Sequence, residues 1–161
     1  WMPMRKGIAA LHRRGQVSQA SNDRYLTALA SLHSDQPVAE LIAPVCRARR
    51  RNGHRVRGIR PWSTEDRDLL KAISRGEYAI NGLRNRDLVR QLYPKASRSS
   101  PEHRRASARV TRKLRMLSQH GIIRKVPRTF RYMLTDKGRQ ITSAILQTQA
   151  LTIEQITKVA A

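Results

Sequence analysis

Residues 121–139 read GIIRKVPRTFRYMLTDKGR, and this stretch decides the predicted fold. Two short runs, Ile122–Val126 and Phe130–Leu134, are suited to strands. The Pro-Arg-Thr triplet at 127–129 lies between them and predicts the tip of a hairpin. Thr135 follows the second run and predicts a helix cap. The stretch therefore predicts a β-hairpin that leads directly into a helix.

A long helix is predicted immediately before this hairpin. Ser100 and Pro101 are residue types preferred at a helix cap and at the first helical position, and Gly121 is a typical end. Apolar residues recur at helical spacing along one face, namely Ala106, Val110, Leu114 and Leu117. The other faces carry the basic residues Arg104, Arg105, Arg109, Arg112, Lys113 and Arg115.

We expect the basic side of this helix to bind nucleic acid. Glu102 is the only acidic residue between positions 95 and 135, whereas a helix face that only contacts water usually alternates acidic and basic residues. The small residue Ala108, in the middle of the basic side, would let the helix approach base edges in a major groove. His103 and His120 are expected to be polar surface or phosphate contacts.

The hairpin is expected to contact the same polymer. Its basic residues are Arg124, Lys125, Arg128 and Arg131. Arg128 is at the predicted tip and is the candidate for a minor-groove contact, because a narrow groove concentrates negative potential. The alternative is that these residues contact only phosphates, which make up half or more of such interfaces.

Two further helices are predicted before the basic helix. Ser63 is the cap of the first, whose opening turn holds three acidic residues, and Gly76 is its end. Tyr78–Ile80 is predicted to be extended, and Asn85 is predicted to cap the second helix, which stops before Pro94. Acids in a first turn stabilise the helix dipole. A nuclease metal site is the alternative for this trio, Glu65, Asp66 and Asp68.

The predicted order of helix, short strand, helix, helix, hairpin and helix is that of a winged helix. Residues 121–139, above all YxLTxKG at 132–138, resemble bacterial winged-helix regulators of the MarR and ArsR kind. This resemblance covers about residues 63–148. It implies a recognition helix, a wing and dimers joined through terminal helices, so a homodimer is possible. The first 60 residues do not match those regulators.

The whole chain also resembles the C-terminal part of a group of longer bacterial proteins of unassigned function. The shared stretches are Gly76–Tyr78, Leu83–Leu88 and Ala108–Arg115. Trp1 stands where a natural chain normally has Met. We therefore expect the chain to be a piece of a longer protein.

The chain before residue 61 is expected to contain two parts. Residues 1–46 form an N-terminal helical segment, with apolar residues of 18–32 on one face and a second helix from Pro37 to about Pro44. Residues 47–60, RARRRNGHRVRGIR, contain seven Arg and no acid. Such a run predicts a basic arm or linker with little structure of its own. Its expected phosphate contacts are Arg49, Arg50 and Arg51.

The predicted fold class is therefore mainly α, a winged helix-turn-helix with an N-terminal helical segment. The winged helix is assigned to residues 61–148. Residues 149–161 are expected to form a short C-terminal helix.

The net charge narrows the possible partners. The 161 residues include 33 Lys and Arg against 11 Asp and Glu, which gives +22. Such an excess repels itself unless a polyanion neutralises it. Arg predominates over Lys, and its planar donors suit phosphates and guanine edges. Nucleic acid is the expected partner, with DNA favoured over RNA, and no membrane-spanning run or signal peptide is present in the sequence.

Catalytic chemistry is not indicated. Cys46 is the only cysteine, which fits a cytoplasmic location and excludes a thiolate zinc site, and no two of the five His have zinc-ligand spacing. We expect no catalytic residues, no metal and no cofactor. The alternatives are a winged helix that binds structured RNA, the DNA-binding end of a mobile-element enzyme whose catalytic part lies elsewhere, and a protein-interaction scaffold.

Overall fold

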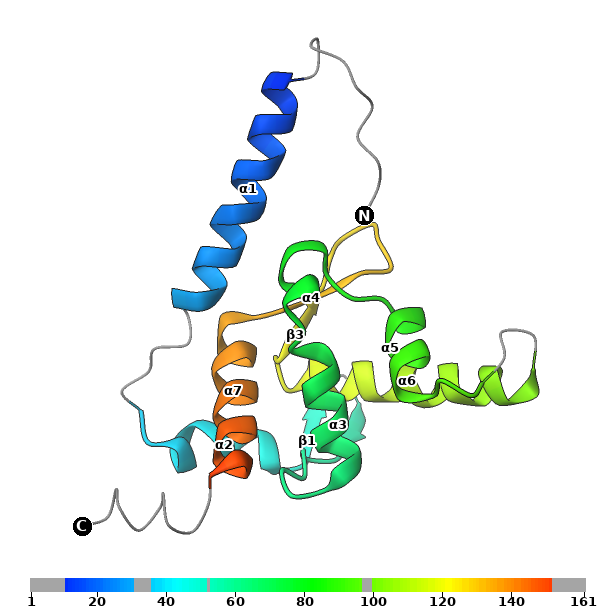
Figure 1. Ribbon diagram of the computed structural model, residues 1–161. Coiled ribbons are helices and arrows are strands. Elements are labelled where there is room, and N and C mark those ends of the chain that lie inside the picture. The colour runs from blue at the N-terminus through cyan, green and yellow to red at the C-terminus, as the bar shows by residue number, and fades with distance from the viewer. Residues whose placement is uncertain (1–10, 31–35, 52, 97–99, 152–161) are drawn as a thin grey trace.

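The computed structural model describes residues 11–30, 36–51, 53–96 and 100–151 (Figure 1). Within these residues the chain is mainly helical, with two small antiparallel hairpins. In chain order the elements are α1 (Leu11–Ala30), α2 (Val38–Cys46), β1 (Arg49–Arg51), β2 (His54–Val56), α3 (Thr64–Ile73), α4 (Gly76–Asn81), α5 (Asn85–Leu92), α6 (Pro101–Gln119), β3 (Ile123–Lys125), β4 (Tyr132–Leu134) and α7 (Asp136–Ala150).

The elements from α3 to α7 follow the order of a winged helix. α5 and α6 form the helix-turn-helix pair, and β3 and β4 form the wing, with Ile123 opposite Leu134 and Lys125 opposite Tyr132. Leu83 adds a single bridge to Tyr132, with N–H···O distances of 2.8 Å in both directions. The predicted class, mainly α with a small wing and an N-terminal helical segment, is confirmed.

The short strand of the winged helix lies at Leu83 and not at Tyr78–Ile80, where it was predicted. Residues Gly76–Asn81 form α4 instead. A helical turn lets Tyr78 face the core while Asn81 faces water, and this burial outweighs the extended preference of the run. Gly76 therefore begins a helix, and α3 has already ended at Ile73.

A single set of buried residues connects α2 to α7. Its members are Leu41, Val45, Ile59, Leu69, Leu70, Ala72, Ile73, Tyr78, Leu83, Leu88, Val89, Ala106, Val110, Leu114, Met116, Leu117, Ile122, Ile123, Leu134, Ile141 and Ile145. Leu41 and Val45 come from α2, and Ile59 comes from the segment before α3. The residues around 38–60 therefore pack into the same core as the winged helix, and the boundary expected at residue 61 does not separate two cores.

α2 continues through Pro44, where it was predicted to end. Pro37 precedes the helix, and the helix reaches Cys46. Val45 is only 2% exposed, so its burial draws the last turn into the core.

α1 (Leu11–Ala30) includes residues before Ser18, the first residue of the predicted helical stretch. It extends away from the core and contacts it at α4 (Figure 1). Tyr25 and Leu26, expected to share an inward face, are 46% and 61% exposed. The side chain of Leu29, the residue Leu32 and the C-terminal helix expected beyond residue 151 lie outside what the structure describes.

Within residues 47–60 the strands β1 and β2 form an antiparallel hairpin, so the expectation of a linker with little structure is wrong. β1 and β2 pair antiparallel, with Arg49 opposite Val56 and Arg50 opposite Arg55. Ile59, just after the hairpin, is buried, and its N–H donates to Val45 O over 2.9 Å. The sequence alone shows only the charge run, whereas the contacts that hold the hairpin come from distant parts of the chain.

Candidate nucleic-acid interface

The arginines of α6 lie together on its exposed side. Its buried side consists of Ala106, Val110, Leu114 and Leu117, with Met116 buried beside them. Because the helix repeats every 3.6 residues, the residues opposite this stripe face water. They are Arg104, Arg105, Arg109, Arg112 and Arg115, together with the small residue Ala108. We call these five arginines the α6 basic face.

Lys113 does not belong to the α6 basic face, although it was expected there. Its side chain is only 11% exposed, and its Nζ lies 3.0 Å from Glu65 Oε1. The pair joins α6 to the first turn of α3. Lys113 sits between the core stripe and the exposed arc of the helix, so a neighbouring helix can reach it.

A polar cluster fixes α6 against α5. Asn85 Nδ2 donates to Ser107 O over 3.0 Å and to Thr111 Oγ1 over 2.9 Å. Ser107 Oγ donates in return to Asn85 Oδ1 over 3.0 Å. Asn85 was predicted to be a cap, but Arg84 holds that position, and its N–H donates to Asp87 Oδ2. This polar cluster sets the orientation of α6, and with it the direction in which the α6 basic face points. No local sequence signal distinguishes an Asn85 that binds another helix from an Asn85 that caps its own.

The N-terminus of α6 follows the prediction. Ser100 is the N-cap, and its Oγ accepts from His103 N over 3.1 Å. Pro101 occupies the first helical position, where its missing N–H has no partner to lose.

The wing, residues 123–134, carries its basic residues as the sequence suggests. Arg124, Lys125 and Arg128 are exposed. Arg131 is half-buried, and its Nη1 donates to Asn81 O, which ties the wing to the end of α4. Arg128 is at the tip with a φ of 57°, in the left-handed region that a non-glycine residue rarely adopts. Three of the four expected wing contacts are thus free to meet a partner.

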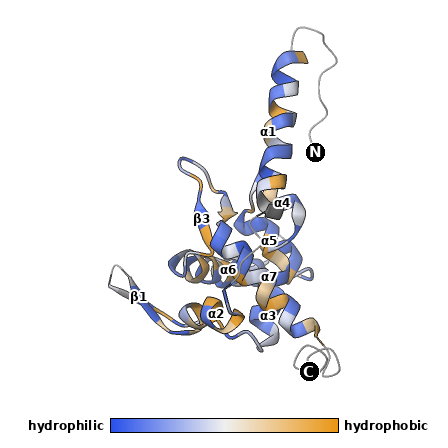
Figure 2. Cartoon of the chain, turned by 90° about the vertical axis from the view of Figure 1, so that its left-hand side faces the viewer, coloured by the Kyte–Doolittle hydropathy of each residue, from blue (hydrophilic) through white to orange (hydrophobic). Residues whose placement is uncertain are grey.

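The hairpin of β1 and β2, residues 49–56, lies beside the C-terminal end of α6. We call it the N-terminal hairpin. Arg49 and Arg50 are exposed, and Arg49 Nη1 donates to Gln119 O over 3.4 Å. The side chain of Arg51 lies outside the described residues. Figure 2 shows the wing and the N-terminal hairpin projecting from the same side of the molecule, one on each side of α6.

An ion pair between an exposed arginine and a buried carboxylate anchors the base of the N-terminal hairpin. Asp66 is 1% exposed, and both its oxygens accept from the Arg57 guanidinium over 2.6 Å. Asp66 Oδ2 also accepts from Arg60 N over 2.8 Å. Burial alone would raise the pKa of Asp66, but these hydrogen bonds from Arg57 and Arg60 prevail and lower it below its ordinary value.

His120 provides a second anchor and is not the surface residue that was expected. It is 2% exposed, and its Nε2 donates to Arg57 O over 2.9 Å. Gly58 provides a third, because a Cβ built there would lie 1.9 Å from Cys46 O. The backbone after the hairpin therefore packs tightly against α2 and the end of α6.

The three acids at the start of α3 do not gather as a metal site. Asp66 faces Arg57, Glu65 faces Lys113, and Asp68 Oδ1 lies 3.8 Å from Arg67 Nε. Across the described ranges, no group of three or more His, Cys, Asp or Glu side chains is placed to hold a metal ion.

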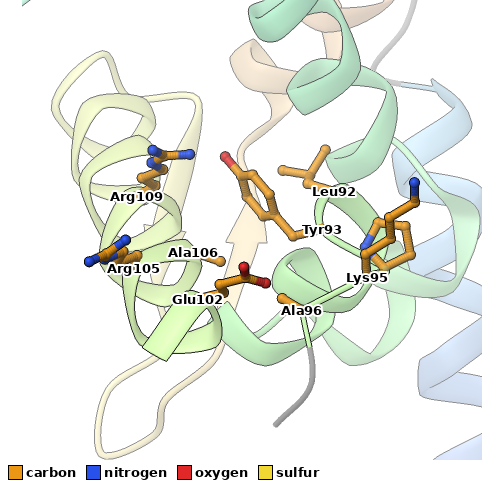
Figure 3. A pocket seen from close by; sticks show the side chains of 9 residues that line it. Leu92, Tyr93, Lys95, Ala96, Glu102, Arg105, Ala106 and Arg109 are labelled. Atoms are coloured by element: carbon orange, nitrogen blue, oxygen red, sulfur yellow. The ribbon is translucent and has the colours of Figure 1, made fainter. Parts of the chain in front are cut away.

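A cavity of about 470 Å³ lies next to the first turns of α6. Figure 3 shows Glu102 and Arg109, from α6, on one side of it and Leu92 and Tyr93, from the end of α5, on the other. Glu102 is the only carboxylate in its lining, which contains neither His nor Cys.

No family model, no curated protein and no solved structure matches this chain. In the part of the chain that the structure describes, no helix is long and apolar enough to cross a bilayer. The function is therefore inferred from the geometry and charge of the surfaces described above.

Proposed function

We propose that this chain binds duplex DNA, with α6 inserted in the major groove. The observation that carries the proposal is the α6 basic face, whose five arginines are exposed together around Ala108 while the opposite side of the helix is buried. A major groove, about 12 Å wide, admits an α-helix. The small side chain of Ala108 leaves room for the helix backbone to approach the base edges.

The wing supports the same orientation. Arg124, Lys125 and Arg128 are exposed on a hairpin that directly follows α6. With α6 in the groove, the wing reaches the flanking backbone or the adjacent minor groove. The resemblance of residues 121–139 to MarR and ArsR regulators agrees with this arrangement.

Groove shape favours DNA over RNA. The major groove of A-form RNA is deep and narrow, so side chains on a helix do not reach its base edges. The net charge of +22 adds sequence-independent attraction to phosphates. We place this activity in the cytoplasm, in line with the resemblance to bacterial regulators.

A competition experiment tests the choice of polymer. The protein is bound to a fluorescent duplex of about 30 base pairs, which gives about three helical turns. Unlabelled duplex DNA and a structured RNA with the same number of phosphates are then added separately. We expect the DNA to displace the probe at a lower concentration. Equal or better displacement by the RNA would favour an RNA-binding winged helix, and the absence of any binding at low salt would reject both.

A further inference from the structure

The N-terminal hairpin contains an unfavourable pair of charges. Arg50 and Arg55 are directly opposite each other in its register, so their side chains lie on the same face. Both are exposed, and no acid occurs between residues 47 and 60. Like charges opposite each other destabilise a strand pair. A bound anion would remove this repulsion.

A groove runs between this hairpin and α6. Its lining consists of Arg55, Val56, Arg57, Glu65, Arg109, Arg112, Lys113, Arg115 and Met116. Two of its cations are already paired, Arg57 with Asp66 and Lys113 with Glu65. Among the described residues, Arg55, Arg109 and Arg115 form no ion pair with a carboxylate. The groove is therefore a strongly positive channel with one wall from the hairpin and one from α6.

The position of the groove matches the path of a DNA strand. The major groove is bordered by two phosphate backbones, one on each side of an inserted helix. The wing and the N-terminal hairpin project on opposite sides of α6 (Figure 2). With α6 in the groove, the wing meets one backbone and the hairpin meets the other.

The hairpin is held in place before any ligand arrives. Its base is fixed by the Arg57–Asp66 pair, by the hydrogen bond from His120 Nε2 to Arg57 O, and by the close packing of Gly58 on Cys46. A preorganised element loses little conformational entropy on binding.

We infer that the N-terminal hairpin is a second wing, and that the groove between it and α6 holds the sugar-phosphate backbone of one DNA strand. This inference rests on the proposed function. It goes beyond it by assigning a backbone site on the flank of α6 opposite the wing. The phosphate contacts are Arg55, Arg109 and Arg115 from the lining of the groove, together with Arg50, which lies opposite Arg55 on the same face of the hairpin.

The test removes the repulsive pair with Arg50→Ser and Arg55→Ser together. The matched control is Arg13→Ser with Arg24→Ser, which removes the same charge from exposed positions on α1, away from the groove. Binding to a duplex of about 30 base pairs is measured between about 50 and about 200 mM salt, and the complex is footprinted with hydroxyl radicals.

The hairpin variant should lose protection on one strand at one flank of the footprint. Its slope of log affinity against log salt should be shallower by about 2, because each lost phosphate contact changes the slope by about 0.9. The control should keep the wild-type slope and footprint. A third protein, with Arg50→Lys and Arg55→Lys, should keep both as well, since it retains the charge.

The outcomes distinguish a failure of the second wing from a failure of DNA binding itself. If wild type binds and the hairpin variant behaves like the α1 control, the second wing is wrong and DNA binding by α6 stands. If wild type does not bind DNA at low salt, both are wrong. The midpoint temperature of thermal unfolding of the serine variant should be unchanged or higher than that of wild type, because the variant lacks the two like charges that repel each other. Should the variant unfold, the wild-type footprint still decides, since it must show protection beyond both flanks of the α6 site.

Discussion

Asp66 shows how one buried carboxylate can organise a surface that does not include it. Its oxygens accept hydrogen bonds from the Arg57 guanidinium and from the N–H of Arg60, so the chain after the N-terminal hairpin is fixed to α3. Its folded-state pKa is lowered below the unfolded value of about 3.9. The stabilisation is therefore present above that value and is lost as the pH falls through the folded pKa.

Replacing Asp66 by Asn should lower the free energy of unfolding at neutral pH by about 1–3 kcal/mol, because charge-assisted hydrogen bonds are lost at a buried site. The free energy of unfolding of the variant should also depend less on pH than that of wild type between about pH 5 and about pH 3. Urea titrations followed by circular dichroism, at both ends of this range, measure the effect.

The control is Asp68→Asn, on the same helix. Asp68 is 52% exposed and 3.8 Å from Arg67, so its replacement should change stability by less than about 1 kcal/mol. If the two substitutions change the free energy of unfolding equally, the Arg57–Asp66 pair stabilises the fold no more than an exposed ion pair does.

At the scale of elements, α7 is joined to the turn between α6 and β3 by a very close backbone contact. Thr135 Oγ1 accepts from Gly138 N over 2.9 Å and donates to Gly121 O over 2.6 Å. A Cβ built on Gly138 would lie 2.0 Å from Ile122 O. The wing therefore keeps its position relative to α6 only if residue 138 has no side chain.

Gly138→Ala should destabilise the protein by at least about 1–3 kcal/mol, the usual loss for overpacking a core, because the neighbouring atom is backbone and cannot rotate away. Gly15→Ala is the matched control. It lies inside α1 with nothing within 4 Å of the added Cβ, so it should stabilise by roughly 0.5–1 kcal/mol. Thermal unfolding of both variants gives the comparison, and a harmless Gly138→Ala would contradict the packing described here.

Elements with strong local signals were predictable from the sequence. The long basic helix, the wing and the cap at Thr135 occur at the predicted residues, because each depends on caps and spacing within a few residues. The N-terminal hairpin was not predictable. Its anchors, Asp66 and His120, are distant in sequence, so the Arg run carries no local sign of them.

In the candidate site too, only features with a local signal were predictable. The exposure of the basic residues of α6 follows from helical spacing, and the prediction holds for the five arginines among the six residues. Lys113 is the exception, because its partner Glu65 comes from another helix. Arg55 was missed as a candidate. The phosphate contact proposed for it depends on its position opposite Arg50 and beside α6, which only the hairpin register and its packing reveal.

At the scale of the whole molecule, two hairpins flank α6. The wing and the N-terminal hairpin project on opposite sides of this helix (Figure 2), and α1 extends away from the core (Figure 1). Glu102 is the only acid on α6. This near-absence of acids gives α6 a strong local positive field in addition to the high net charge of the molecule.

The central claim is that the α6 basic face contacts DNA phosphates and bases. The most direct measurement is the salt dependence of duplex binding for wild type and for the combined variant Arg105→Ser, Arg109→Ser and Arg112→Ser, with the paired α1 variant as a control. We predict a slope of log affinity against log salt that is shallower by up to about 3 in the triple variant, by about 0.9 for each arginine that contacts a phosphate, together with a large loss of affinity at every salt concentration. A triple variant with the affinity and slope of wild type would contradict the claim.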